Sequence, residues 1–159
     1  MIAEAKAEAD EFKDGLTNSI LKGELTYLGI LGEMICKAAI WGFKGPSTFD
    51  YDMTLLGSKW DTKSKRRSVS PRTDYSVSVA NLNGKQKCDY YIFTSICLKK
   101  MEGHILGYYP SDLFWRDCTI INRASGDGDN GFSARETQYN MLAADLFCPT
   151  ELRDKWKVI

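Results

Sequence analysis

The run 88–98 constrains the fold of this chain more than any other stretch. It reads Cys-Asp-Tyr-Tyr-Ile-Phe-Thr-Ser-Ile-Cys-Leu and is almost continuously apolar or aromatic. Such a run is typical of a central strand buried on both faces, whereas a strand with one solvated face alternates between apolar and polar residues. The chain is therefore expected to build a sheet around this strand.

Helical and strand-like patterns lie on both sides of this run. Apolar residues at helical spacing predict helices over 2–21 and 24–40. Alternating residues predict a hairpin over 48–65 and strands at 74–80 and 104–109. The remaining expectations are short: a two-residue turn at Asn83-Gly84, a helix over 110–117 capped by Ser111, a surface loop over 125–131, a capping box over 133–136, and packing of 146–156 against the domain.

Length and composition favour one intracellular domain. A chain of 159 residues is large enough to bury one core, and its 43% apolar content is ordinary for a globular protein. No apolar run approaches the length of a membrane span, so a cytoplasmic protein without a membrane partner is expected. The division of the chain predicted from these patterns is a helical arm at 1–22, a core at 24–109 and a C-terminal elaboration at 110–159.

The cysteines and the single histidine exclude several kinds of site. Five cysteines are widely spaced without a C-x-x-C motif, which favours free thiols in a reducing compartment. With His104 as the one histidine, neither a zinc cluster nor a histidine-dependent catalytic triad is expected. The formal net charge is zero, so any nucleic-acid surface must be a local patch.

Three aspartates and a lysine are expected on one face of the hairpin. With a tight turn, either Leu56 pairs with Lys59 or Leu55 pairs with Ser58, and both registers bring Asp52 near Asp61. Neighbouring strands lie roughly 4.8 Å apart, so these two carboxylates can converge on one cation. Mg²⁺ is usually held by one or two carboxylates with several waters, and Lys63 beside it could orient the attacking water. An exposed hairpin face with an ordinary Asp–Lys ion pair would show the same pattern.

Two further features accompany the hairpin. Glu33 stands among apolar residues of the second helix, where a charged group is either functional or extends from the helix edge to water. A dense group of positive charge, expected in a loop, follows the hairpin and could contact nucleic-acid phosphates or simply be solvated. Its members are Lys65, Arg66, Arg67 and Arg72.

The order of these features resembles the PD-(D/E)XK nuclease superfamily, in a small form of the kind found in phages and in resolvase-like or restriction-type enzymes. The resemblance covers roughly residues 24–109 and rests on the helix glutamate, Asp52 in Phe-Asp-Tyr-Asp-Met, and Asp61-Thr-Lys63. No proline precedes the aspartate, so the first half of the motif is absent, and Asp50 is the rival of Asp52 as first metal ligand.

The resemblance implies an α/β fold with a mixed central sheet flanked by helices, a restriction-endonuclease-like core, to which this chain adds an N-terminal helix. It implies hydrolysis of DNA phosphodiester bonds with Mg²⁺ or Mn²⁺. Asp52 and Asp61 would hold the metal, Lys63 would act on the water, and Glu33 would lie in the outer shell or complete a second metal site. The alternatives are an inactive module of the same fold that binds nucleic acid or protein, and an interaction protein that forms a homodimer through the N-terminal helix.

Overall fold

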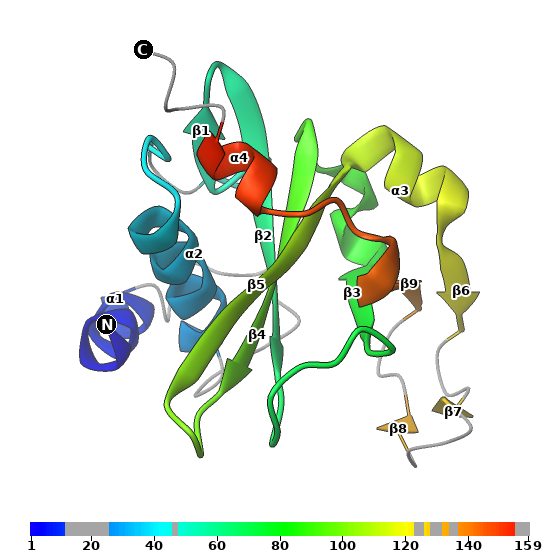
Figure 1. Cartoon of the computed structure of the whole chain (residues 1–159), viewed down its shortest axis with the longest axis horizontal. Helices are drawn as coiled ribbons and strands as arrows, with labels where there is room; N and C mark the ends of the chain where they lie inside the picture. Colours follow the sequence, from blue (N-terminus) through cyan, green and yellow to red (C-terminus); the bar gives the residue numbers. More distant parts are fainter. Residues whose placement is uncertain (12–25, 46–47, 123–125, 128–131, 134–136, 155–159) are drawn as a thin grey trace.

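The computed structural model describes residues 1–11, 26–45, 48–122, 126–127, 132–133 and 137–154. Its centre is a four-stranded mixed sheet in the order β1-β2-β4-β5 (Figure 1). The first hairpin pairs β1 with β2 antiparallel, β4 lies parallel to β2, and β5 returns antiparallel to β4. The strands are β1 (Met53–Leu55), β2 (Ser58–Arg66), β4 (Tyr90–Cys97) and β5 (Glu102–Pro110). The prediction of an α/β fold with a mixed sheet is confirmed.

The predicted central strand is β4, and both of its faces are covered. Every residue of β4 after Tyr90 is buried. On one face, helix α2 (Tyr27–Ala39) packs against the sheet through Leu28, Leu31 and Cys36, and its residue Gly32 lies directly over Ser64 and Thr94. A side chain at position 32 would collide with these two hydroxyls, so the glycine permits the close approach of helix and sheet.

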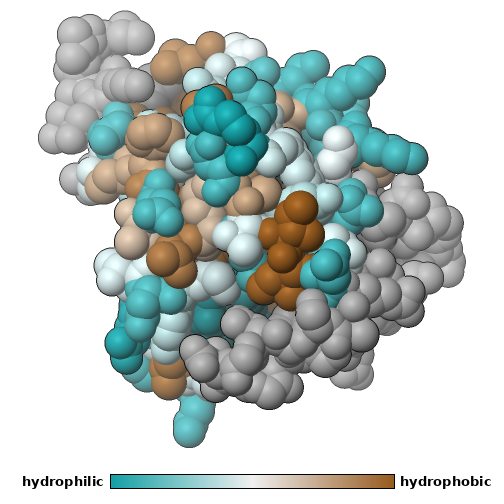
Figure 2. All heavy atoms as spheres, turned by 90° about the vertical axis from the view of Figure 1, so that its right-hand side faces the viewer, coloured by the Kyte–Doolittle hydropathy of each residue, from teal (hydrophilic) through white to brown (hydrophobic). Residues whose placement is uncertain are grey.

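A second sheet covers the opposite face. It has the order β3-β9-β6 and contains β3 (Ser76–Ala80), β9 (Gln138–Leu142) and β6 (Thr119–Ile121). Val77 and Val79 of β3 pack with Tyr91, Phe93 and Phe114 between the two sheets. Figure 2 shows the side of the molecule that carries this second sheet, where a small apolar area lies among polar side chains. In the second sheet, Ile120 of β6 and Leu142 of β9 are large apolar residues that are exposed.

The remaining elements are short. Helix α1 (Ile2–Glu11) packs on α2 of the same chain and buries Ala5 and Ala9. The predicted first helix spans residues 2–21, of which 12–21 lie outside the described residues. The other elements are η1 (Asn81–Lys85), α3 (Ser111–Asp117), β7 (Gly126–Asp127), β8 (Phe132–Ser133), η2 (Ala143–Asp145) and α4 (Thr150–Asp154).

Several local predictions were wrong, each because a tertiary contact overrides a local signal. Asn83-Gly84 lies in the 3₁₀ turn η1 instead of a hairpin, since β3 pairs with the distant β9 and not with β4. Ser111 begins α3, but its hydroxyl donates to the carbonyl of Cys88 at 2.5 Å and does not cap the helix. Ser133 belongs to strand β8, and the other residues of the predicted capping box, 134–136, lie outside the described residues, as does most of the surface loop predicted at 125–131.

The predictions for the chain end and the cysteines are confirmed. Leu152 is buried in the cluster beneath α2 and Leu146 packs, partly buried, against the cluster between the two sheets, so the last described segment packs back on the domain. All five cysteines are free thiols, although Cys148 is exposed. Among the described residues, none of the helices combines the length and apolar character that crossing a membrane requires.

Candidate metal centre

The hairpin adopts the second of the two predicted registers. Leu55 pairs with Ser58 and Met53 pairs with Trp60. Leu56 and Gly57 form the turn, and both have positive φ angles of 52° and 82°, as a two-residue turn of the I′ kind requires. Trp60 consequently points into the core beneath α2, which leaves Asp61 on the other face of β2.

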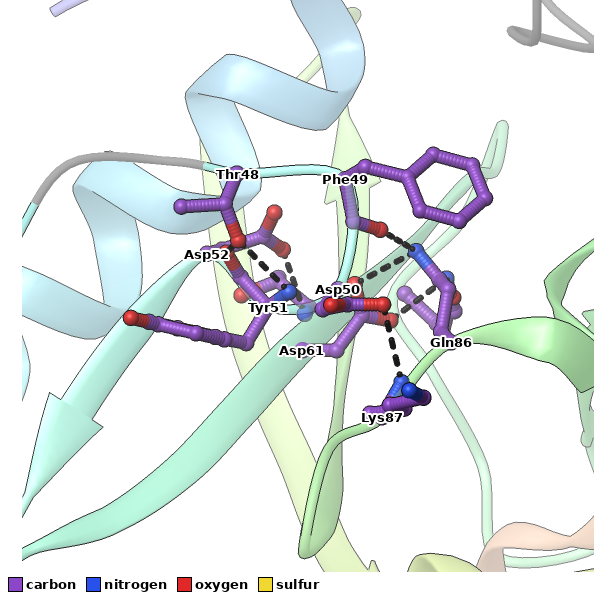
Figure 3. Close-up of polar contacts among 10 residues, drawn as sticks. Thr48, Phe49, Asp50, Tyr51, Asp52, Asp61, Gln86 and Lys87 are labelled. Carbon is purple, nitrogen blue, oxygen red and sulfur yellow. Dashed lines mark hydrogen bonds and ion pairs between the residues drawn. The ribbon is translucent and has the colours of Figure 1, made fainter.

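Asp52 lies at the point where the hairpin ladder becomes irregular. Its backbone N–H donates to the carbonyl of Trp60 at 2.9 Å, and its Oδ2 accepts the backbone N–H of Thr62 at 2.6 Å (Figure 3). The carboxylate thus takes the place of a backbone carbonyl at the edge of β2. This contact holds it beside the backbone of the residue that follows Asp61.

Asp61 is 2% exposed and forms a triangle of polar contacts with Lys63 and Gln86. Lys63 Nζ lies 2.5 Å from Asp61 Oδ2. Gln86 Nε2 donates to Asp61 Oδ1 at 3.2 Å, and Lys63 Nζ donates to Gln86 Oε1 at 3.0 Å. The same Gln86 amide donates to the carbonyl of Phe49 at 2.9 Å (Figure 3). The amide therefore fixes the ion pair and ties it to the chain that precedes Asp52.

Sequence reasoning missed Gln86. The residue follows η1 directly, and the pairing of β4 with β2, together with the bonds between Lys59 and Asp89, brings this segment beside the hairpin. A single amide two residues before Cys88 carries no pattern of its own. The contact with Asp61 across 25 positions became visible only from the fold.

Glu33 approaches from the opposite face of the sheet, on α2. Burial and the charge of Asp52 raise the pKa of Glu33 to about 8, while Lys37, 3.6 Å away, opposes the shift. Burial likewise raises the pKa of Asp61 to about 7, against the attraction of Lys63 and with a further rise from Asp52. Asp52 is thus the neighbour whose charge acts on both carboxyls.

A glutamine at position 33 is expected to stabilise the protein at alkaline pH. The Glu33 carboxyl has a folded pKa of about 8 against an ordinary 4.5, so the folded state binds a proton that the unfolded state releases. Stability therefore falls as the pH rises from about 4.5 to about 8 and stays low above it. Glu33→Gln should gain on the order of 1–3 kcal/mol at pH 9 and nothing at pH 4. Urea unfolding at both pH values measures this; an equal gain at both would contradict it.

Asp50, the alternative to Asp52 as first metal ligand, makes a different contact. Its Oδ1 accepts the backbone N–H of Lys87 at 3.2 Å, so this carboxylate supports the segment that carries Gln86. Burial is the main cause of the raised pKa of Glu33 and Asp61, and the charge of Asp52 is a further cause in both cases. This favours Asp52 as the first metal ligand.

The donor set suits a hard cation held by few protein ligands. Within the described part of the chain, no group of three or more His, Cys, Asp or Glu side chains lies close enough to form a closed metal cage. Mg²⁺ does not need one, since it is usually held by one or two carboxylates and keeps several waters. Asp52 and Asp61 offer two mutually repelling carboxylates, whose repulsion a cation would relieve. The residues therefore fit Mg²⁺ or Mn²⁺.

The predicted basic residues are largely engaged within the protein. Lys65 and Arg66 continue strand β2, so the prediction of a loop there was wrong. Lys65 Nζ lies 3.2 Å from Ser78 Oγ, and an Arg67 amine donates to the carbonyl of Ser76 at 2.6 Å. Arg72 forms a 2.9 Å ion pair with Asp74. Two of the four side chains, Lys65 and Arg67, thus hold the first sheet to β3, while the Arg72 pair is local, and phosphate contact by the group stays a prediction.

A large cavity of about 1250 Å³ adjoins this region. It is lined by Lys65, Arg66 and Arg67, but also by acidic side chains. These are Asp74, Asp117 and Asp145. The mixed charge gives the cavity no preference for a polyanion.

Comparison with known proteins identifies no family, so the class of this protein is defined by its fold alone. No protein-family model, no curated protein and no solved structure matches the chain. The molecule is an α/β protein with a mixed sheet, and its buried carboxylate–lysine cluster is the candidate site.

Proposed function

We propose that this protein is a metal-dependent nuclease that hydrolyses DNA phosphodiester bonds. The observation that carries the proposal is the convergence of Asp52 and Asp61 beside Lys63. Asp52 directly precedes β1 and bonds to Trp60 across the hairpin, whereas Asp61 lies in β2. Burial raises the pKa of Asp61, and the charge of Asp52 raises it further. Soluble proteins rarely bury like charges together unless a cation or a reaction uses them.

The order of elements supports a restriction-endonuclease-like core. A helix with the glutamate precedes the hairpin, the hairpin carries Asp52 and Asp-x-Lys, and a buried strand parallel to β2 follows. The mixed sheet with α2 on one face agrees with the fold that the PD-(D/E)XK resemblance implies. Strand β3 lies between β2 and β4 in the sequence but belongs to the second sheet, β3-β9-β6.

The chain's own residues can be given distinct tasks. A bound Mg²⁺ or Mn²⁺ would polarise a phosphoryl oxygen and lower the pKa of a water. Asp52 and Asp61 hold the cation in this proposal. Lys63, kept in place by Gln86, offsets negative charge on the phosphate and orients the attacking water. Glu33, whose raised pKa keeps it largely protonated at neutral pH, tunes the charge at Asp52 from the outer shell.

Cleavage assays test the proposal. Plasmid, single-stranded and branched DNA are incubated with the protein in Mg²⁺, Mn²⁺ or EDTA. Wild type should cut at least one substrate only with metal, and Asp61→Asn should lower the rate about 100-fold or more. Asp50→Asn is the matched control, because its carboxylate supports a backbone N–H and should keep most activity. If no substrate is cut, or if Asp61→Asn cuts as well as wild type, the protein is not this nuclease.

One observation favours a second function, that of a non-catalytic binding module. Both oxygens of Asp61 already have partners, Oδ1 with Gln86 and Oδ2 with Lys63. A metal must therefore compete with the Lys63 ammonium for Oδ2. Salt-dependent binding of DNA without any metal-dependent cleavage would establish this function in place of the first.

A further inference from the structure

Two segments far apart in sequence form a rigid rim beside the carboxylate cluster. Residues 49–52 and 86–89 are joined by the bond from Gln86 to the Phe49 carbonyl and by the bond from the Lys87 N–H to Asp50. The second segment is in turn joined to β2, where the Lys59 N–H donates to Asp89 Oδ2 at 2.7 Å and the Asp89 N–H donates back to the Lys59 carbonyl at 2.8 Å. This network fixes the rim relative to Asp61 (Figure 3).

Phe49 presents an aromatic side chain on this rim. The side chain is 54% exposed although its own backbone carbonyl is tied to the residue that holds Asp61 and Lys63. In Figure 3 its ring points away from the carboxylates, beyond Gln86. An exposed ring that is held next to a polar cluster by its own backbone is a preformed stacking surface.

Exposed lysines lie on the segments that are joined to Phe49. Lys85 and Lys87 flank Gln86, and the backbone of Lys59 bonds to Asp89. Lys59 lies 5.3 Å from the Tyr51 ring centroid, and in the part of the chain that the structure describes no ion pair engages the ammonium of Lys85 or Lys87. Asp50 and Asp89 are the acidic residues nearby, and each accepts a backbone N–H. This contrasts with Lys65, Arg67 and Arg72, whose side chains bond to the protein.

We propose that this rim, defined by Phe49, Lys59, Lys85 and Lys87, binds a single-stranded segment of nucleic acid. One unpaired base stacks on Phe49, and the lysines contact the flanking phosphates. A base within a duplex has both of its faces covered by neighbouring bases, so the exposed ring selects an unpaired one. The inference rests on the proposed nuclease function and names its substrate class, a strand that is single-stranded where it passes the carboxylates.

Binding in EDTA tests this surface independently of cleavage. Fluorescence anisotropy is measured with labelled single-stranded DNA, single-stranded RNA and duplex DNA of equal length over a series of salt concentrations. Phe49→Ala should weaken single-strand binding about 10-fold, while Phe49→Trp should keep it. Lys85→Gln with Lys87→Gln should lower the slope of log K against log salt by about 1.4, near 0.7 for each lost phosphate contact.

Two charge-matched variants complete the design. Lys99→Gln with Lys100→Gln removes the same charge after β4, at the end of that strand away from the rim, and should bind as wild type does. Arg66→Gln with Arg72→Gln also removes two positive charges, here from the basic group that was predicted from the sequence. Tight binding to either RNA or DNA supports the proposal and identifies the strand. Four results would overturn it: a larger loss of affinity in the arginine variant than in the Lys85/Lys87 variant, unchanged binding by Phe49→Ala, tighter binding of duplex than of single strands, or no binding by wild type. Failure of cleavage with this binding pattern intact would remove the nuclease function alone.

Discussion

Replacing Lys63 with methionine is expected to lower the free energy of unfolding by about 3–5 kcal/mol at pH 8. Asp61 is 2% exposed, and the Lys63 ammonium 2.5 Å away is its counter-charge. Methionine retains an unbranched apolar stem and removes the ammonium, whose nitrogen lies 5.7 Å from the centroid of the Tyr91 ring, so the substitution removes charge more than packing. The remaining carboxylate would be buried without a partner cation, which is the costly state of a broken buried ion pair.

The effect of this substitution should depend on pH in a defined direction. Burial already raises the pKa of Asp61 to about 7 in the presence of Lys63, and loss of the ammonium raises it further. At pH 5 the variant's carboxyl is therefore protonated when folded, and the loss of stability should be clearly smaller than at pH 8. Urea unfolding at the two pH values measures both effects.

A double variant separates stability from function. Asp61→Asn combined with Lys63→Met removes both charges and should recover most of the lost stability, because no buried charge remains. It should nevertheless be inactive in the cleavage assays. A single Lys63→Met variant as stable as wild type at pH 8 would show that Asp61 is not a buried charge, and the site would need another explanation.

The second large effect concerns Asp52. Asp52→Asn is expected to weaken Mn²⁺ binding at least about 10-fold, since it removes one of the two proposed anionic ligands. The amide oxygen can still accept the Thr62 N–H, so the hairpin edge should stay intact. The same change should lower the pKa of Glu33, because the Asp52 charge is one of the causes of its rise.

Titration calorimetry with Mn²⁺ measures the affinity, and the isosteric Asp50→Asn is the control. The Asp50 carboxylate accepts the Lys87 N–H and should be needed much less for the metal. If Asp50→Asn loses the affinity and Asp52→Asn keeps it, the assignment of the first ligand is reversed. A crystal soaked in Mn²⁺ would show the same distinction directly as density between Asp52 and Asp61.

Local patterns in the sequence were enough for the central sheet. The apolar run at 88–98 predicted β4, and alternation around Gly57 predicted a hairpin in one of two registers. In both cases the signal lies within one or two neighbouring strands. Burial of Trp60 excludes a register slip, because it would bring the ring among the aspartates.

The rest of the site depends on contacts that no local pattern encodes. Asn83-Gly84 carries the ordinary signal of a hairpin turn, yet β3 finds its partner about sixty positions later in β9. Gln86 gains its contact with Asp61 because β4 pairs with β2 across about thirty positions. Lys65 and Arg67 appear in the sequence as free positive charge, while in the structure they bond to serines of β3. Pairings of this kind are properties of the whole chain.

The pairing of β3 with β9 also has a consequence for how the protein reaches its working form. The turn that carries Gln86 follows β3 immediately, and β3 is held by a strand at residues 138–142. Such non-local pairing forms late, because a long loop must close first. During synthesis the hairpin and α2 leave the ribosome well before β9. We therefore expect β3 and β9 to cover Tyr91 and Phe93, beside the Asp61–Lys63 pair, only after nearly the whole chain has been made, so that a C-terminally truncated chain leaves these two aromatic residues exposed.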